Sequence, residues 1–286
     1  MLINFLHTYN PQSILITFGP ITVYWYGFFM ALALLLGLLI SVKIAKWHGV
    51  KKEVIYDLFF WLIIGGFLGA RIFYILYNFN YFWQNPFDIF KIWQGGIAIH
   101  GALVFGFLIL LWFSKKSKIN FWRLTSIIVP GVALGQAIGR WGNYFNQELF
   151  GLPTDLSWGI PIALANRPAG YEMFEYFQPT FLYESLGNFF IFCLLLMFHW
   201  FLTHNTHNVK RITHNTLRLQ KLYGMRYELC VMSYAFLYSI LRFFIEFLRI
   251  DPTAGNIFGM RATQGLSLII IIAVVGYLVY DKSKKK

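Results

Sequence analysis

Residues 139–151 have the sequence Gly139-Arg140-Trp141-Gly142-Asn143-Tyr144-Phe145-Asn146-Gln147-Glu148-Leu149-Phe150-Gly151. The segment follows a run of small and apolar residues at 130–138 and places an arginine, two asparagines and a glutamate between three glycines. Such polar groups beside an apolar helix cost free energy unless they are paired or bind a ligand. The glycines predict a sharp backbone turn that can approach a ligand closely. Two interpretations remain open: a ligand-binding loop, and a helix end capped by an arginine–glutamate pair.

The composition predicts an integral membrane protein. Of the 286 residues, 58% are hydrophobic and only 13% are charged, whereas a soluble domain carries about a quarter charged residues. Several apolar runs have the roughly 20 residues that a helix needs to cross a bilayer. Strand-like alternation is absent from these runs, so helices are the expected spanning form. We therefore expect an all-α polytopic membrane protein that forms a single integral membrane domain over residues 1–286.

The apolar runs predict seven transmembrane helices, and the basic residues between them predict an orientation. We expect these helices at residues 21–42, 54–77, 97–113, 121–138, 180–202, 228–250 and 264–280. Most of the 24 Lys and Arg residues follow the first, third, fifth or seventh helix. The positive-inside rule therefore predicts an outside N-terminus and a cytoplasmic C-terminus. Residues 139–178 then form an extracytoplasmic segment with short helices or strands, and residues 203–227 form a cytoplasmic loop.

The charge distribution and the cysteine and histidine positions indicate which ligands and partners to expect. The formal net charge of +12 is distributed over short loops, where it sets topology and meets anionic lipid, so we expect membrane lipid and no nucleic acid as a partner. Cys193 and Cys230 lie in or beside apolar runs and predict neither a disulfide nor a metal site. His204, His207 and His214 are spaced by Asn and Thr, which favours a solvated loop over a metal site.

The predicted topology brings seven ionisable side chains to one depth in the outer leaflet. They are Arg71, His100, Arg140, Glu148, Glu184, Arg242 and Glu246. An isolated charge at the bilayer centre costs about 2.5–3.5 kcal/mol, so we expect these groups to share a cavity, partly paired. Within this set, Arg242 and Glu246 lie four residues apart on one helix face with Tyr238, and Arg242–Glu246 alone could be a structural pair.

The chemistry of this set indicates a phospholipid. Guanidinium groups bind phosphate through two parallel hydrogen bonds, and the glutamates would hold the arginines in position. His100, with a usual pKa of about 6.5, is either a proton acceptor for a second substrate or only a hydrogen-bond donor. A lipid transporter, a lipid phosphatase and a purely structural protein are the alternatives. The absence of an apparent internal repeat and the single depth of the charges disfavour transport.

These residues also carry a family resemblance. The chain resembles the prolipoprotein diacylglyceryl transferases over nearly its whole length, in residues 139–151 above all. The other matching motifs are Tyr26-Gly27, Gly69-Ala70-Arg71, His100-Gly101, the segment from Pro179 to Glu184, Tyr238, Arg242, and Glu246 to Arg249. The resemblance implies the same seven-helix topology in the bacterial cell membrane, with an active site toward the extracytoplasmic leaflet.

The resemblance implies a reaction and its residues. The diacylglyceryl group of phosphatidylglycerol would move to the lipobox cysteine thiol of a preprolipoprotein signal peptide, forming a thioether and releasing glycerol 1-phosphate. The implied catalytic residues are His100, Arg140, Tyr238 and Arg242. The implied phosphatidylglycerol-binding residues are Tyr26, Arg71, Arg140, Asn143, Asn146, Glu148, Gly151, Glu184, Arg242 and Glu246. No metal and no cofactor are expected.

Two positions depart from the family pattern. Many members have a second glycine where this chain has Ala102, and many have histidine where this chain has Gln178. A proton-transfer role at position 178 is therefore in doubt, although a hydrogen-bonding role is retained. The sequence leaves open the acyl-chain preference, the oligomeric state and the route of peptide entry.

Overall fold

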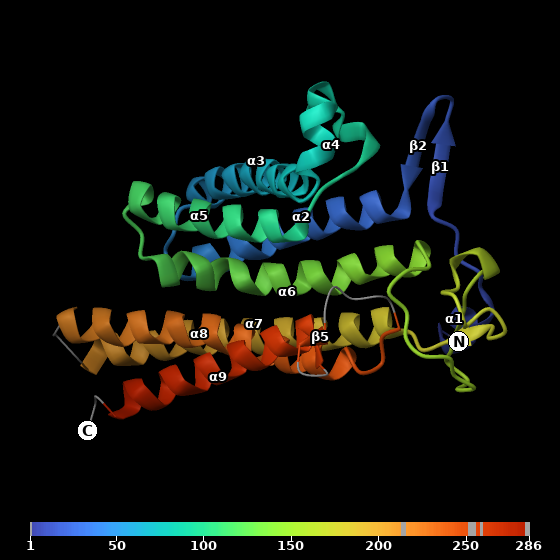
Figure 1. Cartoon of the computed structure of the whole chain (residues 1–286). Helices are drawn as coiled ribbons and strands as arrows, with labels where there is room; N and C mark the ends of the chain where they lie inside the picture. Colours follow the sequence, from blue (N-terminus) through green and yellow to red (C-terminus); the bar gives the residue numbers. More distant parts are fainter. Residues whose placement is uncertain (1, 213–215, 251–255, 258–259, 284–286) are drawn as a thin grey trace. The chain divides into compact units, whose positions relative to one another are not determined.

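The computed structural model describes residues 2–212, 216–250, 256–257 and 260–283. Seven of its helices are long and apolar enough to cross a membrane, which confirms the predicted polytopic all-α class. They are α2 (Trp25–Trp47), α3 (Lys52–Tyr77), α5 (Ile99–Ser117), α6 (Phe121–Phe145), α7 (Thr180–Ile212), α8 (Thr216–Ile245) and α9 (Ala262–Ser283) (Figure 1). The orientation of these helices in the membrane stays a prediction.

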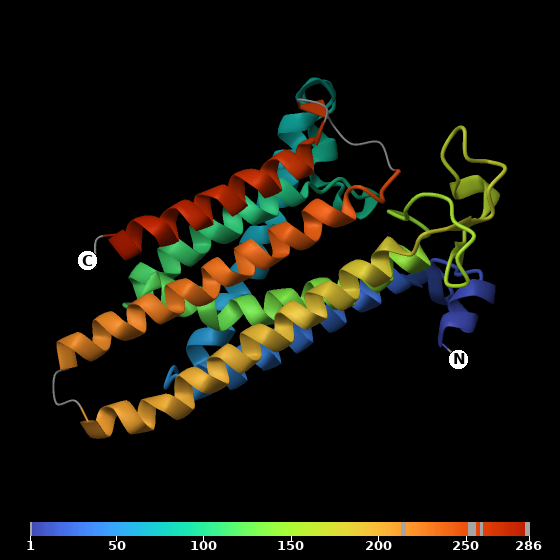
Figure 2. The same ribbon diagram turned by 90° about the horizontal axis from the view of Figure 1, so that it is seen from below.

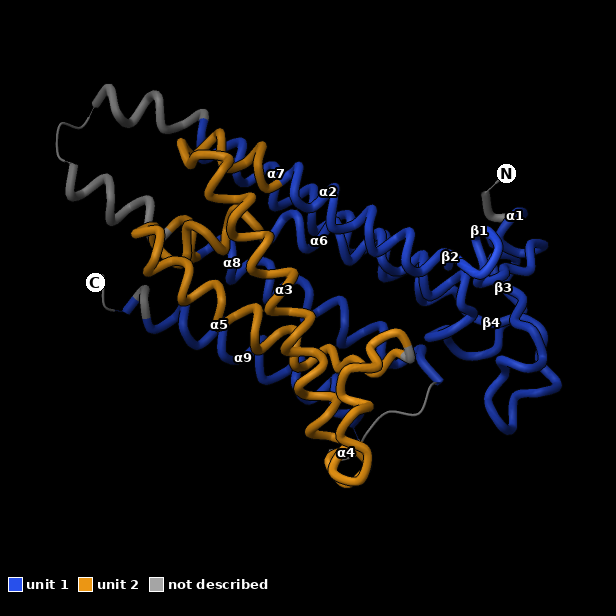
Figure 3. Tube along the Cα trace, turned by 90° about the horizontal axis from the view of Figure 1, so that it is seen from above, with its two compact units in different colours: residues 1–40, 129–214, 229–286 blue, residues 41–128, 215–228 orange. Residues whose placement is uncertain are grey.

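The chain forms two compact units (Figure 3). Unit 1 contains residues 1–40, 129–214 and 229–286, and unit 2 contains residues 41–128 and 215–228. The expectation of one integral membrane domain over residues 1–286 stays a prediction.

The N-terminal part of unit 1 differs from the sequence expectation. A short helix, α1 (Leu2–Thr8), is followed by a hairpin of β1 (Ile14–Phe18) and β2 (Ile21–Tyr24), in which Phe18 pairs with Ile21. The first transmembrane helix therefore begins at Trp25 and not at residue 21. The cause is the β-branched composition of these strands, with the turn made by Gly19 at φ +55°.

Helix α6 continues past the expected end at residue 138. No turn occurs at Gly139, the first glycine of the 139–151 segment, because the backbone stays helical to Phe145. Gly142 serves packing instead: a Cβ atom there would lie 2.8 Å from Cδ2 of Tyr26, which only a glycine avoids. The chain turns after the helix, at Gln147 (φ +50°) and Leu149 (φ +57°).

The segment after α6 forms a small lobe with its own core. It contains β3 (Ile160–Pro161), the 3-10 helix η3 (Leu164–Asn166) and β4 (Tyr176–Phe177), with β3 and β4 antiparallel. Figure 2 shows α1 beside this lobe. The shared apolar core consists of Leu6, Tyr144, Phe150, Ile160, Ile162, Phe177 and Phe181. The lobe thus contains the short strands that were expected between the fourth and fifth transmembrane helices.

In unit 2, α3 and α5 lie side by side (Figure 1). Gly69 and Gly101 allow this contact, because a Cβ atom on Gly101 would lie 2.1 Å from the Gly69 carbonyl oxygen. The helices are joined through α4 (Phe79–Gln84) and the 3-10 helices η1 (Pro86–Phe90) and η2 (Ile92–Gln94). This connection carries Asp88, whose pKa is lowered by its ion pair with Lys91 and by a hydrogen bond from the Tyr81 hydroxyl.

The expected loop at residues 203–227 is largely helical. Helix α7 runs to Ile212 and α8 begins at Thr216, whereas residues 213–215 lie outside the described part of the chain. The segment contains one glycine and no proline, so little in its sequence stops a helix that closes its hydrogen bonds internally. The side chains of His204, His207 and His214 lie outside the described residues, as do residues 251–255 between α8 and the pair of β5 (Asn256–Ile257) and β6 (Met260–Arg261).

Candidate active site

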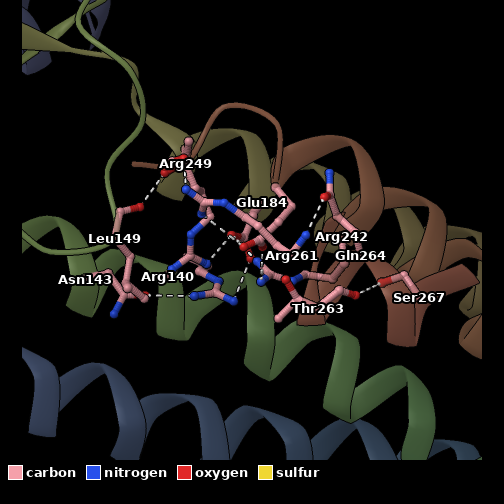
Figure 4. Close-up of polar contacts among 12 residues, drawn as sticks. Arg140, Asn143, Leu149, Glu184, Arg242, Arg249, Arg261, Thr263, Gln264 and Ser267 are labelled. Carbon is pink, nitrogen blue, oxygen red and sulfur yellow. Dashed lines mark hydrogen bonds and ion pairs between the residues drawn. The ribbon is translucent and has the colours of Figure 1, made fainter. Parts of the chain in front are cut away.

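A buried glutamate organises the polar cluster of unit 1 (Figure 4). Glu184 lies one turn into α7 and is 1% exposed. Its carboxylate is 2.6 Å from Nη2 of Arg140, 2.7 Å from Nη1 of Arg242 and 3.7 Å from Nη1 of Arg249. One carboxylate therefore holds guanidinium groups from α6, from α8 and from the segment after α8.

A second buried carboxylate extends the cluster. Glu246, also 1% exposed, lies 2.9 Å from Nη2 of Arg242 and 3.3 Å from Nη1 of Arg261. The Arg261 Nη2 group donates a further hydrogen bond to the main-chain oxygen of Arg249, at 2.6 Å. Four guanidiniums thus share two carboxylates, and this excess of positive charge favours an anionic ligand.

Glu148 reaches this cluster through an asparagine. Arg140 donates through Nη1 to the Asn143 side-chain oxygen at 3.2 Å, and Asn143 donates to Glu148 Oε1 at 2.7 Å. Asn146 donates to the same glutamate oxygen at 3.5 Å. The structure therefore joins three residues of the 139–151 segment to Arg140, and Glu148 acts on the arginine indirectly.

The four arginine side chains of the cluster differ in their exposure to solvent. The side chains of Arg140 and Arg261 are 20% and 23% exposed, whereas those of Arg242 and Arg249 are 13% and 7% exposed. Both Nη groups of Arg242 are paired with carboxylates. An anion that enters the cluster would thus meet Arg140 and Arg261 first.

Gly151 is packed too closely for any side chain. A Cβ atom there would lie 2.8 Å from the Leu248 carbonyl oxygen and 2.9 Å from Cγ2 of Thr180. Its backbone also forms a β-bridge with Arg249, and its N–H donates to the Gln178 carbonyl at 2.9 Å. At position 178 these hydrogen bonds are made by the main chain, so they do not depend on the glutamine side chain.

The two tyrosines of the predicted site lie on different helices of unit 1. The ring of Tyr26, near the start of α2, packs against Gly142 of α6. The ring of Tyr238 stacks on Tyr234 at 5.8 Å, and the Tyr234 hydroxyl donates to Gln136 at 3.0 Å.

Arg71 and His100 belong to unit 2. The Arg71 side chain is buried and donates to main-chain oxygens of Asp88 (2.7 Å), Ile89 (3.1 Å), Gly95 (2.8 Å) and Gly96 (2.9 Å). These bonds occupy most of its five N–H donors, so the role of Arg71 in lipid binding stays a prediction.

His100 is exposed in the first turn of α5. Its ring lies edge-on to that of Tyr77, with the ring centroids 6.4 Å apart. The expectation that Arg71 and His100 share one cavity with the unit 1 residues is a prediction.

Sequence reasoning missed two members of the cluster. The predicted site contains neither Arg249 nor Arg261, although Arg249 ends the matching motif that begins at Glu246. For Arg261 no local signal exists, since its partner Glu246 is 15 residues away. Gln264 accepts a hydrogen bond from the Arg261 main-chain N–H at 3.1 Å and so fixes the start of α9.

Among the described side chains, no group of three or more His, Cys, Asp or Glu residues could hold a metal ion. The cluster holds four guanidinium groups and two carboxylates, a balance of charge that suits an acidic ligand. Together with the seven helices, it defines a polytopic membrane protein with a buried cluster of arginines and glutamates.

The family is shown by sequence comparison. Residues 13–280 match the family model described as prolipoprotein diacylglyceryl transferase. The chain belongs to this family of membrane transferases.

Several relatives are similar over most of their length. A phosphatidylglycerol–prolipoprotein diacylglyceryl transferase of Trichormus variabilis is 42% identical over 86% of this chain and 82% of the relative. Proteins of the same description from Synechococcus elongatus and from Synechococcus sp. strain CC9902 are 38% and 42% identical. They cover 97% and 92% of this chain, and 90% and 91% of their own lengths.

Proposed function

We propose that this chain transfers the diacylglyceryl group of phosphatidylglycerol to the lipobox cysteine thiol of a preprolipoprotein. The reaction forms a thioether and releases glycerol 1-phosphate. We further propose that the protein lies in the bacterial cell membrane, with its active site toward the extracytoplasmic leaflet. The names of the relatives support the two substrates, and the basic residues of alternate loops support the orientation.

The observation that carries this proposal is the arrangement of arginines around Glu184. Arg140 is held by a carboxylate on one side and by Asn143 on the other, and it remains one of the more exposed guanidiniums of the cluster. A guanidinium held in this way is preorganised for a phosphate oxygen, because its own partners already set its direction.

The proposed chemistry follows from this charge distribution. The thiolate sulfur attacks the diacylglyceryl carbon that carries the phosphate ester oxygen. A carbon–sulfur bond forms while that carbon–oxygen bond breaks, and its electron pair leaves with glycerol 1-phosphate. The departing phosphate gains one negative charge, which Arg140 and Arg242 stabilise more strongly than the charge of the intact lipid.

The attacking thiol must lose its proton first. A thiol with a usual pKa of about 8.5 is a weak nucleophile near neutral pH until it becomes a thiolate. We assign the acceptance of this proton to His100, because an imidazole is the most common general base in enzymes. The proton then passes to water or to the released phosphate.

The remaining residues shape the lipid pocket in this proposal. Asn143 and Asn146 bind the headgroup and, with Glu148, orient Arg140. Gly151 keeps the loop close to Arg249, and Tyr26 and Tyr238 position lipid or peptide. Arg71 is a further candidate contact to phosphatidylglycerol in this proposal. It would bind the lipid through an N–H group that does not donate to the main-chain oxygens of the α3–α5 connection.

A direct assay separates this proposal from lipid transport. Purified protein is incubated with phosphatidylglycerol and a lipobox peptide, and the peptide is examined by mass spectrometry. We expect a diacylglyceryl mass increment on the cysteine together with released glycerol phosphate. If the lipid binds and the peptide mass stays unchanged, the transferase proposal fails and lipid transport becomes the better reading.

Replacing Arg140 tests the phosphate-binding role. We expect Arg140→Ala to lower turnover at least about a hundredfold, because a preorganised charge on the leaving group is lost. Arg140→Lys should recover only part of the rate, since a lysine keeps the charge without the planar fork. Lys91→Ala, which removes a cation that is 41% exposed in unit 2, is the control. Wild-type turnover by folded Arg140→Ala would contradict the role.

A further inference from the structure

We propose that Gln147 is a positioning residue that couples the N-terminal segment of the chain to the loop carrying Glu148. This inference rests on the proposed function, because the group that it positions is Glu148 and, through Asn143, Arg140. Gln147 lies next to Glu148 in the chain, but its side chain makes an entirely different set of contacts.

The Gln147 amide is buried and fully used. Its Nε2 group donates to the Asn10 side-chain oxygen at 2.8 Å and to the Pro11 carbonyl at 2.7 Å. Its Oε1 atom accepts from the Ala163 N–H at 2.7 Å and from Asn166 Nδ2 at 3.2 Å. Two donors and two acceptor sites are the whole capacity of a glutamine side chain, so one residue joins three separate segments.

These contacts hold a backbone conformation that a glutamine rarely adopts. Gln147 has a φ of +50°, in the left-handed region where residues other than glycine are uncommon. This turn allows the Glu148 N–H to donate to the Asn143 carbonyl at 3.0 Å. The same turn places the Glu148 carboxylate where it accepts a hydrogen bond from the Asn143 side-chain amide. The geometry of the Arg140 contact thus depends on the turn at Gln147.

The N-terminal partners of Gln147 are themselves firmly held. Leu6 is 1% exposed in the apolar core of the lobe. The His7 ring lies 2.7 Å from the Gly159 carbonyl through Nδ1 and stacks on Tyr176 with centroids 4.3 Å apart. Asn10 and Pro11 therefore meet Gln147 from a docked segment that lies 136–137 residues away in sequence.

A substitution of nearly equal shape gives the sharpest test. In Gln147→Glu, the two acceptor contacts to Ala163 and Asn166 survive, whereas a carboxylate has no hydrogen for the Pro11 carbonyl. Protonation of this carboxylate restores one O–H donor, which can bond the Pro11 carbonyl again. The ratio of variant to wild-type kcat/KM should therefore rise as the pH falls from about 8 to about 5.5, as the carboxyl takes up its proton near the carbonyl.

Two alanine variants test the coupling across the contact. We expect Gln147→Ala and Asn10→Ala each to lower kcat/KM, by about tenfold and about threefold, as hydrogen bonds of the Gln147 amide are lost. In the double variant the losses should be less than multiplicative, because both remove the same contact. Thr8→Ala is the matched control, since the Thr8 hydroxyl, within the described part of the chain, donates to the main-chain oxygens of Asn4 and Phe5 in its own helix α1.

Amide hydrogen exchange gives a readout that does not require turnover. In Gln147→Ala, the amide of Glu148 should exchange at least about tenfold faster than in the wild type, whereas Thr8→Ala should leave it unchanged. Unchanged exchange, or a flat pH ratio for Gln147→Glu, would overturn the positioning role. If the wild-type protein itself fails to modify the peptide, the proposed function fails, and the exchange experiment still decides the role of Gln147.

Discussion

At the scale of single residues, the balance of charge around Glu184 controls the site. Burying an ionised group is costly unless it is paired, and removing one partner leaves the other uncompensated. Glu184 is the common partner of Arg140, Arg242 and Arg249. It thereby allows several guanidiniums to approach one another, and it makes the cluster less positive than the arginines alone would make it.

Replacing Glu184 should therefore lower the stability of the folded protein, in addition to any effect on the reaction. We expect Glu184→Gln to lower the free energy of unfolding by about 3 kcal/mol, because three arginines lose their shared counter-ion. Thermal unfolding in detergent measures the change. Glu172→Gln is the control, since Glu172 is a solvent-exposed acid of the lobe that bonds the Gly170 N–H. Equal melting temperatures for Glu184→Gln and the wild type would show that the cluster needs no such counter-ion.

At the scale of elements, the packing of α3 against α5 depends on glycine at the contact. The backbones of these helices meet at Gly69, two residues before Arg71, and at Gly101, directly after His100. Small residues at such contacts let helices in lipid approach closely, where van der Waals packing replaces the hydrophobic effect. The residue pair thus fixes the start of α5, which carries His100.

Two substitutions on α5 should have opposite effects. We expect Gly101→Ala to destabilise the protein by about 1–3 kcal/mol, because the new Cβ atom would lie 2.1 Å from the Gly69 carbonyl oxygen. Gly106→Ala meets no atom within 4 Å and should stabilise the helix by about 0.5–1 kcal/mol. Thermal unfolding of both variants tests the contact, and two shifts of the same sign would argue against it.

At the scale of the whole molecule, the orientation in the membrane can be tested directly. In a background with Cys193→Ser and Cys230→Ala, we expect a membrane-impermeant maleimide added to intact cells to label Thr8→Cys and not Ser283→Cys. Both positions are exposed, so permeabilised cells should label both. The reverse pattern in intact cells would overturn the predicted orientation and with it the extracytoplasmic active site.

Part of the site could be predicted because its signals are local or chemical. Arg242 and Glu246 are four residues apart on one turn, so their ion pair followed from helical spacing. The pairing of Arg140 with Glu184 joins two helices, and Arg249 and Arg261 join the cluster from segments outside α8. Which residues form these ion pairs depends on how the segments pack together, and the spacing of residues along the sequence does not reveal this.

The sequence by itself determined the membrane class, the seven helices and the family, since long apolar runs and the 139–151 motif are properties of consecutive residues. Only the tertiary structure decided where the chain turns after α6 and which groups Arg71 binds. Gly142 is needed against Tyr26 and not for a turn, while Gln147 makes the turn with side-chain partners from two other segments. Such contacts join residues far apart in the chain, and their free energy exists only once the segments have packed together.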